Sequence, residues 1–194
     1  MKNNSNLREY TNFKHDVLVY GPIGEQRLKD ILTQRGHKFE DVSSIEEFRI
    51  FDVDIIQYNN SDTTYKDVLN SYYLGKSTNH VNAIAYEVKT DTYGIISRNI
   101  VFEELSNSNN GCMARTKADY LFYVFVNKDN EIIEEYLINI RKLRWWLMLN
   151  FSKINKCDYL KSKTMRRGED NTGIFLINID HLINDKISGA IRLT

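Results

Sequence analysis

Cysteine, proline and net charge are all scarce in this chain of 194 residues. There are two cysteines, Cys112 and Cys157, and one proline, and 26 Lys and Arg residues balance 26 Asp and Glu residues. Two distant cysteines form neither a disulfide framework nor a zinc motif, so a reduced, cytoplasmic setting is the simple expectation. Because the formal net charge is zero, no bulk charge indicates a nucleic-acid partner.

Long hydrophobic runs are absent too. No segment has the roughly 20 consecutive apolar residues that a membrane span needs, and residues 1–14 contain no apolar signal core. We therefore expect no membrane partner. Hydrophobic residues still make up 42% of the chain, which is enough for a packed core. The length fits a single domain over residues 1–194.

Charge is unevenly distributed along this neutral chain. Nine basic residues and only one acid, Asp158, lie between Arg141 and Arg167. This stretch therefore carries a charge of +8, and the rest of the chain carries −8. Such asymmetry indicates that different regions have different tasks, although runs of charge are more often solvated surfaces.

The apolar periodicity predicts alternating helices and strands. Gly21 and Pro22 begin a helix of about fourteen residues that stops near Gly36, with Leu28 and Leu32 in its buried stripe. We predict strands at 47–58, 81–89, 99–105, 119–126 and 172–180. A second long helix is predicted at 139–150. This order is typical of an α/β domain with a mixed sheet.

Carboxylates gather on two of the predicted strands. Alternation places Asp52 and Asp54 on one face of the first strand, and Glu87 and Lys89 on the small-residue face of the second, like the floor of a cleft. Converging carboxylates are the ligands that Mg²⁺ prefers, and a nearby ammonium group can neutralise developing charge. The pattern predicts a site for Mg²⁺ or Mn²⁺, with the Val88 carbonyl as a further ligand.

A longer ordered set of residues surrounds these groups. Tyr86-Glu87-Val88-Lys89-Thr90-Asp91 is followed by Ser97-Arg98-Asn99-Ile100-Val101-Phe102-Glu103 and then by Thr116-Lys117-Ala118-Asp119-Tyr120. Together with the upstream aspartates, this set resembles the PD-(D/E)XK nuclease superfamily, which includes restriction enzymes, Holliday-junction resolvases and phage nuclease-like proteins. The resemblance covers residues 21–126. In contrast to the motif's name, Phe51 and Val53 stand before the two aspartates where a proline would be.

The resemblance implies a restriction-endonuclease-like αβββαβ core, with a central mixed sheet flanked by helices, and an extension over residues 131–194. It also implies a Mg²⁺-dependent DNA endonuclease. Asp54 or its neighbour Asp52 would bind the metal ion, with Asp54 slightly preferred, and Glu87 would be the second ligand. Lys89 would orient water or phosphate. Two further acids complete the candidate catalytic set: Glu25 on the first helix and Glu103 on the strand after Lys89.

The candidate DNA-contacting residues are mostly basic. They are Arg141, Arg144, Lys161, Lys163, Arg166, Arg167, Lys117 and Asn99. Hydrogen bonding within the fold is an equally good role for Asn99 and Glu103. Trp145 and Trp146 are expected in the core rather than as surfaces for stacking on bases. The four histidines show no metal-ligand spacing.

Other functions remain open at this stage. Taken alone, Glu87 and Lys89 are what a solvated strand face with one ion pair would also show. A fold does not determine a function, so a catalytically silent, nuclease-like factor that binds DNA or protein is the alternative, and an RNA-directed nuclease is a weaker one. The expected substrate is double-stranded or branched DNA. A homodimer is plausible, as is the cytoplasm of a phage-infected host cell.

Overall fold

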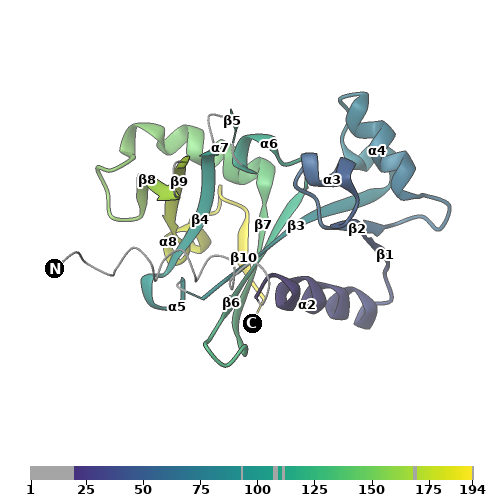
Figure 1. The fold of residues 1–194 in the computed structure, drawn as a ribbon, viewed down its shortest axis with the longest axis horizontal. Helices are drawn as coiled ribbons and strands as arrows, with labels where there is room; N and C mark the ends of the chain where they lie inside the picture. The colour runs from purple at the N-terminus through teal and green to yellow at the C-terminus, as the bar shows by residue number, and fades with distance from the viewer. Residues whose placement is uncertain (1–19, 93, 107–108, 111, 168–169, 194) are drawn as a thin grey trace.

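A computed structural model describes residues 20–92, 94–106, 109–110, 112–167 and 170–193. Within these ranges, the side chains of residues 104–113 and 164–172 are not described. The centre of the fold is a six-stranded sheet of order β1-β2-β3-β6-β7-β10 (Figure 1). The strands are β1 Lys38–Asp41, β2 Ile55–Tyr58, β3 Ala83–Asp91, β6 Tyr120–Val126, β7 Ile132–Asn139 and β10 Ala190–Arg192. Neighbours are antiparallel except β3 and β6, which are parallel, so the sheet is mixed.

A second, antiparallel sheet of order β5-β4-β9-β8 lies beside it. Its strands are β4 Asn99–Ser106, β5 Asn109–Asn110, β8 Leu160–Arg167 and β9 Asp170–Asn178. The helices are α2 Gly21–Gln34, α3 Glu46–Ile50, α4 Tyr65–Tyr73, α5 Gly94–Ser97, α6 Cys112–Arg115, α7 Ile140–Asn150 and α8 Ile179–Asn184, with 3-10 turns η2 Thr78–Val81 and η3 Phe151–Lys153. None of the helices in the described ranges combines the length and apolar character that a membrane crossing requires.

The two faces of the central sheet are covered differently. Helix α2 lies along one face (Figure 1), where Leu28 and Leu32 pack with Ile55, Tyr86 and Phe122. The opposite face shares a larger core with the second sheet and with α3, α4, α7 and α8. Side chains on both faces of β3 are therefore packed against other elements.

Helix α2 approaches β3 closely at one glycine. A Cβ atom added to Gly24 would stand 2.4 Å from Thr90 Oγ1 and 3.0 Å from Val88 Cγ1. The missing side chain lets the helix backbone lie directly on the strand end that follows Glu87. The expected helix from Gly21 is confirmed, and Gly36 ends it at a φ of 70°.

Two predicted strands and one predicted core residue differ from the structure. The strand predicted over 47–58 is wrong in its first half: α3 occupies 46–50, a turn follows, and only β2 is extended. The strand predicted over 99–105 forms as β4 but belongs to the second sheet. Trp145 was expected in the core and is 55% exposed, whereas Trp146 is fully buried as expected.

The cause of the first error is local. Glu46 and Glu47 occupy the first turn of α3, where carboxylates favour the helix dipole. Phe48 is then fully buried, and its ring contacts Tyr65 and Tyr72 of α4 edge to face. The helical conformation of residues 46–50 therefore goes with the packing of Phe48 onto α4, which lies further along the chain. Alternation of polar and apolar residues within 47–58 does not reveal this contact.

Candidate active site

Asp54 lies directly against β3 at the centre of the candidate motif. Its backbone N–H donates to the Tyr86 carbonyl at 2.9 Å, and its Oδ2 accepts from the Val88 N–H at 2.7 Å. Val88 stands between Glu87 and Lys89. The start of β2 therefore holds the Asp54 carboxylate beside the Glu87-x-Lys89 sequence through two main-chain contacts.

Glu87 and Lys89 point to the same side of β3, as their spacing predicts. Lys89 Nζ lies 2.8 Å from Glu87 Oε1. The pair is not a solvated strand face, because Glu87 is only 4% exposed, while the Lys89 side chain is 41% exposed. The expected open cleft floor is wrong for the rest of this face, since Ala83 and Ala85 are buried in the larger core.

Burial and mutual repulsion perturb both carboxyl groups. Burial raises the pKa of Glu87 to about 8, helped by the charges of Asp54 and Asp52 and opposed by Lys89. Burial likewise raises the pKa of Asp54 to about 6, against the Val88 hydrogen bond and Lys89, and with Glu25 and Asp52 adding repulsion. Lys89 lowers both pKa values, but it does not offset burial and the acidic neighbours.

The donor chemistry of Asp54 and Glu87 fits a hard divalent cation. Such a cation prefers carboxylate oxygens, and Mg²⁺ often uses one or two carboxylates, with water or substrate phosphate completing its six ligands. Its charge would offset the repulsion that raises both pKa values. Within the described ranges, however, no group of three or more His, Cys, Asp or Glu residues is arranged to hold a metal ion.

Asp52 occupies a different position from the one that strand alternation predicts. It lies in the turn after α3 with a φ of 45°, and Arg115 binds both its carboxylate oxygens, at 2.8 and 2.6 Å. Thr116 Oγ1 donates to the Asp52 carbonyl, and the Lys117 N–H donates to the Phe51 carbonyl. Asp52 is therefore an anchor for residues 115–117, and Asp54 is the aspartate beside Glu87.

Glu25 approaches the cluster from α2. It lies beyond the first helical turn and is half-buried. Burial, Asp41 and Glu87 raise its pKa, and Lys29 opposes them. Glu25 is thus electrostatically coupled to the site from the helix side.

The remaining candidates lie further out. Asn99 and Glu103 are on β4, opposite Asn178 and Ile174 of β9. Lys117 and Lys163 are exposed.

Five more of the basic candidates lie in α7 and β8. Arg141 is exposed, and Arg144 donates to the Thr116 carbonyl at 2.8 Å. Lys161 Nζ is 3.6 Å from Asp158. The side chains of Arg166 and Arg167 lie outside the described residues.

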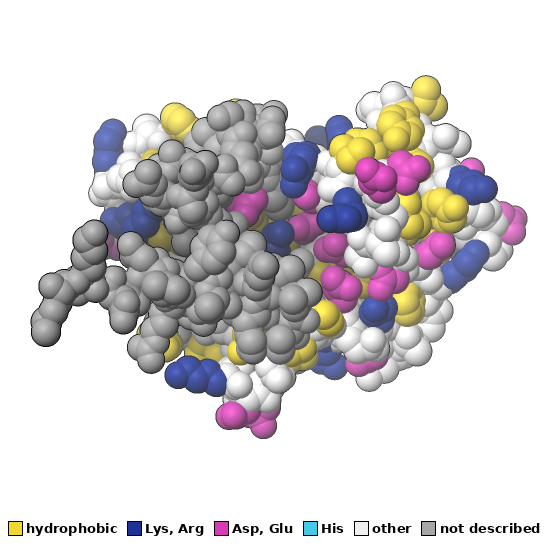
Figure 2. Space-filling model, viewed as in Figure 1, with side chains coloured by type: hydrophobic (Ala, Val, Ile, Leu, Met, Phe, Trp, Pro, Cys, Tyr) yellow, Lys and Arg dark blue, Asp and Glu magenta, His cyan; other side chains and the backbone are white. Residues whose placement is uncertain are grey.

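Arg115 is the residue of this region that the sequence did not reveal. It is separated from Asp52 by 63 positions, and nothing local marks it as a partner. On the face drawn in Figure 2, acidic and basic side chains gather over the middle of the molecule.

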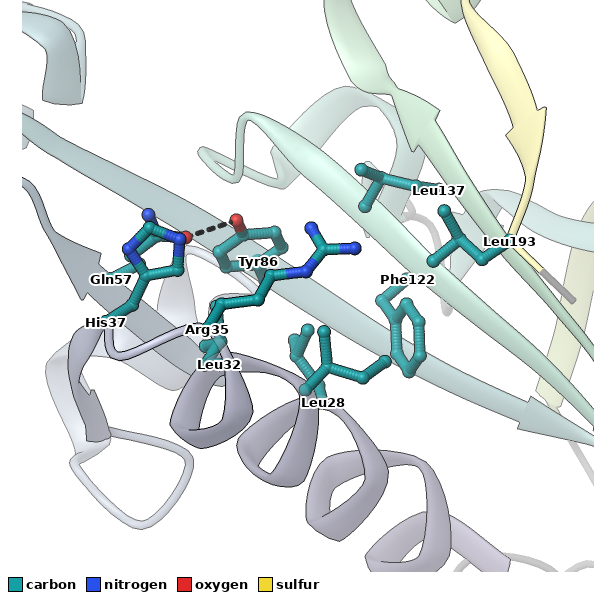
Figure 3. Close-up of a pocket in the computed structure, with 10 residues that line it drawn as sticks. Leu28, Leu32, Arg35, His37, Gln57, Tyr86, Phe122, Leu137 and Leu193 are labelled. Carbon is teal, nitrogen blue, oxygen red and sulfur yellow. Dashed lines mark hydrogen bonds between the residues drawn. The ribbon is translucent and has the colours of Figure 1, made fainter.

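A small pocket of about 50 Å³ lies on the α2 side of the sheet (Figure 3), and neither Asp54 nor Glu87 lines it. Leu28, Leu32 and Phe122 line it, and Tyr86 donates to Gln57 Oε1 at 2.7 Å in its wall. It has room for about one or two water molecules. The candidate chemistry is therefore at Asp54 and Glu87 rather than in this pocket.

No family model matches this chain, and neither the curated proteins nor the solved structures give a match.

Proposed function

We propose that this protein is a Mg²⁺- or Mn²⁺-dependent deoxyribonuclease of the PD-(D/E)XK type, with Asp54, Glu87 and Lys89 at its active site. The observation that carries the proposal is the hydrogen bond from the Val88 N–H to the Asp54 carboxylate. Val88 stands in the sequence between Glu87, which is buried, and Lys89, which is half-exposed. Burying two neighbouring carboxyl groups is costly, and a bound cation or substrate would offset part of that cost.

The order of elements supports the finer fold assignment. Helix α2 is followed by three antiparallel strands, β1, β2 and β3, and then by β6 parallel to β3. This order is close to αβββαβ, with additions: α3 lies between β1 and β2, α4 and η2 lie between β2 and β3, and α5, β4, β5 and α6 replace one long helix between β3 and β6. Asp54 precedes β2, and Glu87 and Lys89 are on β3, which supports the assignment.

Each residue has a distinct role in the proposed hydrolysis. Asp54 and Glu87 would hold the divalent cation, which supplies a polarised water and charge stabilisation at the phosphate. Lys89 would orient the attacking water or neutralise developing phosphate charge from its exposed end. The Val88 N–H keeps the Asp54 carboxylate in place. Glu25 would add acid from the helix side, and Arg144 and Arg141 would contact the DNA backbone.

Cleavage assays test this proposal directly. Supercoiled plasmid, linear duplex, single-stranded and branched DNA are incubated with the protein and Mg²⁺ or Mn²⁺, with EDTA as the metal-free control. We expect metal-dependent cleavage, with Asp54→Asn, Glu87→Gln and Lys89→Ala each reducing the rate about 100-fold or more. Asp129→Asn is the matched control, because Asp129 is exposed in the turn between β6 and β7. Cleavage of none of these substrates by folded protein would overturn the proposal.

One observation favours a second candidate function, a nuclease-like factor that binds DNA without cutting it. No ready-made group of three metal-ligating side chains occurs in the part of the chain that the structure describes. This candidate predicts DNA binding that is unchanged by EDTA and by Glu87→Gln, together with no cleavage.

A further inference from the structure

The outward face of α7 and η3 is unusually apolar for a surface. Trp145, Met148 and Phe151 are 55%, 56% and 65% exposed, and Leu149 is 48% exposed. The opposite side of the same helix, with Leu143 and Trp146, is fully buried. Isolated exposed apolar residues are common, but a contiguous group of this kind marks a binding surface. We refer to the exposed residues 145, 148, 149 and 151 as the α7 platform.

The platform has cations around it and no acids in its own segment. Residues 140–157 contain Arg141, Lys142, Arg144, Lys153 and Lys156 and no Asp or Glu. Helical spacing places Arg141 and Arg144 on the same face as Trp145 and Met148. Aromatic side chains among cations are the chemistry that binds unpaired nucleic-acid strands, because bases stack on the rings while phosphates contact the cations.

The platform is physically connected to the candidate active site. Arg144 donates to the Thr116 carbonyl, and Thr116 donates to the Asp52 carbonyl, two residues before Asp54. In Figure 1, α7, α6 and α3 follow one another across the upper part of the molecule. A strand lying on α7 would therefore be held beside the turn that leads into the site.

We propose that the α7 platform binds an unpaired DNA strand, with bases stacked on Trp145 and Phe151 and phosphates on Arg141 and Lys153. This inference rests on the proposed nuclease function and narrows its substrate to DNA with a single-stranded segment. Paired bases keep their faces stacked within a duplex, so they cannot stack on these rings. In an interfacial membrane helix the cations stand on the polar face opposite the apolar one, whereas Arg141 and Arg144 share the face of Trp145. Two facing copies of this surface would bring like charges together.

Binding is measured in EDTA with the Glu87→Gln protein, so that cleavage plays no part. Fluorescence anisotropy compares a labelled oligothymidylate with a duplex of the same length. We expect tighter binding of the single strand, with Trp145→Ala and Phe151→Ala each weakening it roughly 5- to 100-fold. Trp145→Phe keeps an aromatic face and should retain most of the affinity. Ile96→Ala, which removes an exposed apolar side chain of α5, should change nothing.

The two tryptophans provide a second readout. Trp145 is exposed and Trp146 is fully buried, so an oligonucleotide should quench fluorescence from Trp145, and the quenching should disappear in Trp145→Phe. Equal affinity for single strand and duplex, or unchanged affinity in Trp145→Ala, would overturn the inference. So would Trp145-dependent binding to vesicles of phosphatidylserine and phosphatidylcholine, or Trp145-dependent dimerisation in light scattering, when single strands do not bind.

This experiment separates the inference from the proposed function. Trp145-dependent single-strand binding without cleavage by the unmodified protein supports the platform and refutes the nuclease. Metal-dependent cleavage without Trp145-dependent binding supports the nuclease and refutes the platform.

Discussion

At the scale of single residues, the candidate site joins two carboxylates to one ammonium group in a poorly solvated place. The Val88 N–H donates to Asp54, and the Lys89 ammonium group contacts Glu87. These contacts lower both pKa values but do not overcome burial. In the folded protein without a cation, both carboxyl groups therefore hold their protons to a higher pH than ordinary Asp and Glu residues do.

The first prediction concerns the pH dependence of stability in metal-free buffer. Folding raises the Glu87 pKa from its ordinary 4.5 to about 8, so the folded state binds more protons than the unfolded state between these values. The free energy of unfolding must then fall as pH rises through this window. Glu87→Gln removes that contribution, so we expect its stability relative to the unmodified protein to rise by roughly 1–3 kcal/mol between about pH 5 and pH 8.

Urea denaturation in EDTA across that pH range measures the effect. Asp129→Asn should follow the unmodified protein at every pH, because this exposed acid is not part of the cluster. Parallel stability curves for Glu87→Gln and the unmodified protein would contradict the prediction.

The second prediction separates the two aspartates that the sequence left unresolved. Asp54→Ala should abolish cleavage, whereas Asp52→Ala should leave measurable activity and lose the Arg115 ion pair. Because the Arg115 side chain is 41% exposed, we expect a coupling energy of only about 1 kcal/mol between Asp52 and Arg115. A double-mutant cycle in denaturation experiments measures it. If Asp52→Ala inactivates the protein as completely as Asp54→Ala, our assignment of the two residues is wrong.

The sequence could predict part of this site because part of it is local. The spacing of Glu87 and Lys89 determines that they share a side of the strand, and the structure confirms this. The position of Asp52 depends on a turn with a positive φ and on an arginine 63 residues away. No periodic pattern contains that information, so alternation could not assign different roles to Asp52 and Asp54.

At the scale of elements, α2 is held against β3 by the absence of a side chain at Gly24. Alanine favours helices over glycine by about 1 kcal/mol, so Gly24→Ala would stabilise an isolated helix. In the protein its Cβ would meet Thr90 Oγ1 at 2.4 Å. Thr90 is β-branched and lies in a strand, so its side chain has little freedom to move away.

We therefore predict that Gly24→Ala destabilises the protein by about 1–3 kcal/mol. Gly21→Ala is the matched control on the same helix, since nothing lies within 4 Å of the Cβ it would add, and it should be neutral or slightly stabilising. Thermal or chemical denaturation compares the two variants. Equal stabilities would mean that α2 and β3 adjust without cost.

The elements that the sequence predicted well are those whose signals are strong and local. The proline and glycine punctuation of α2 and the continuous apolar run of β6 are examples, and both elements form. Strand β1 and helix α3 are four and five residues long, too short for periodicity to identify. Their conformations depend on pairing with β2 and on the burial of Phe48.

At the scale of the whole molecule, two sheets share one large core, with contributions from Leu121 and Ile138 of the central sheet and Ile100 and Ile177 of the second. No sequence pattern indicated that β4 would pair in the second sheet, because contacts far apart in the chain determine which strands pair. The basic segment from Arg141 to Arg167 begins in α7, where Arg144 donates to the Thr116 carbonyl, and ends in β8 of the second sheet. A neutral chain can thus present a cationic surface to a polyanion.

The final prediction follows from that separation of charge. Each phosphate contact releases counterions, so the logarithm of affinity falls with the logarithm of salt concentration, by about 0.7 per contact for single strands and about 0.9 for duplex DNA. Replacing one contacting cation should therefore reduce the slope by about one contact. Arg141 and Lys163 are exposed within the +8 segment, so we expect Arg141→Gln and Lys163→Gln to weaken DNA binding and flatten its salt dependence.

Lys128→Gln removes the same charge from an exposed position in the turn between β6 and β7, outside the segment, and should leave the slope unchanged. Anisotropy titrations at several salt concentrations give all the slopes. Each of the three variants removes one positive charge. A difference between their salt-dependence slopes therefore reports the position of the lost cation and not the change in net charge. The same loss of slope in Lys128→Gln would place the DNA elsewhere or show that binding responds only to overall charge.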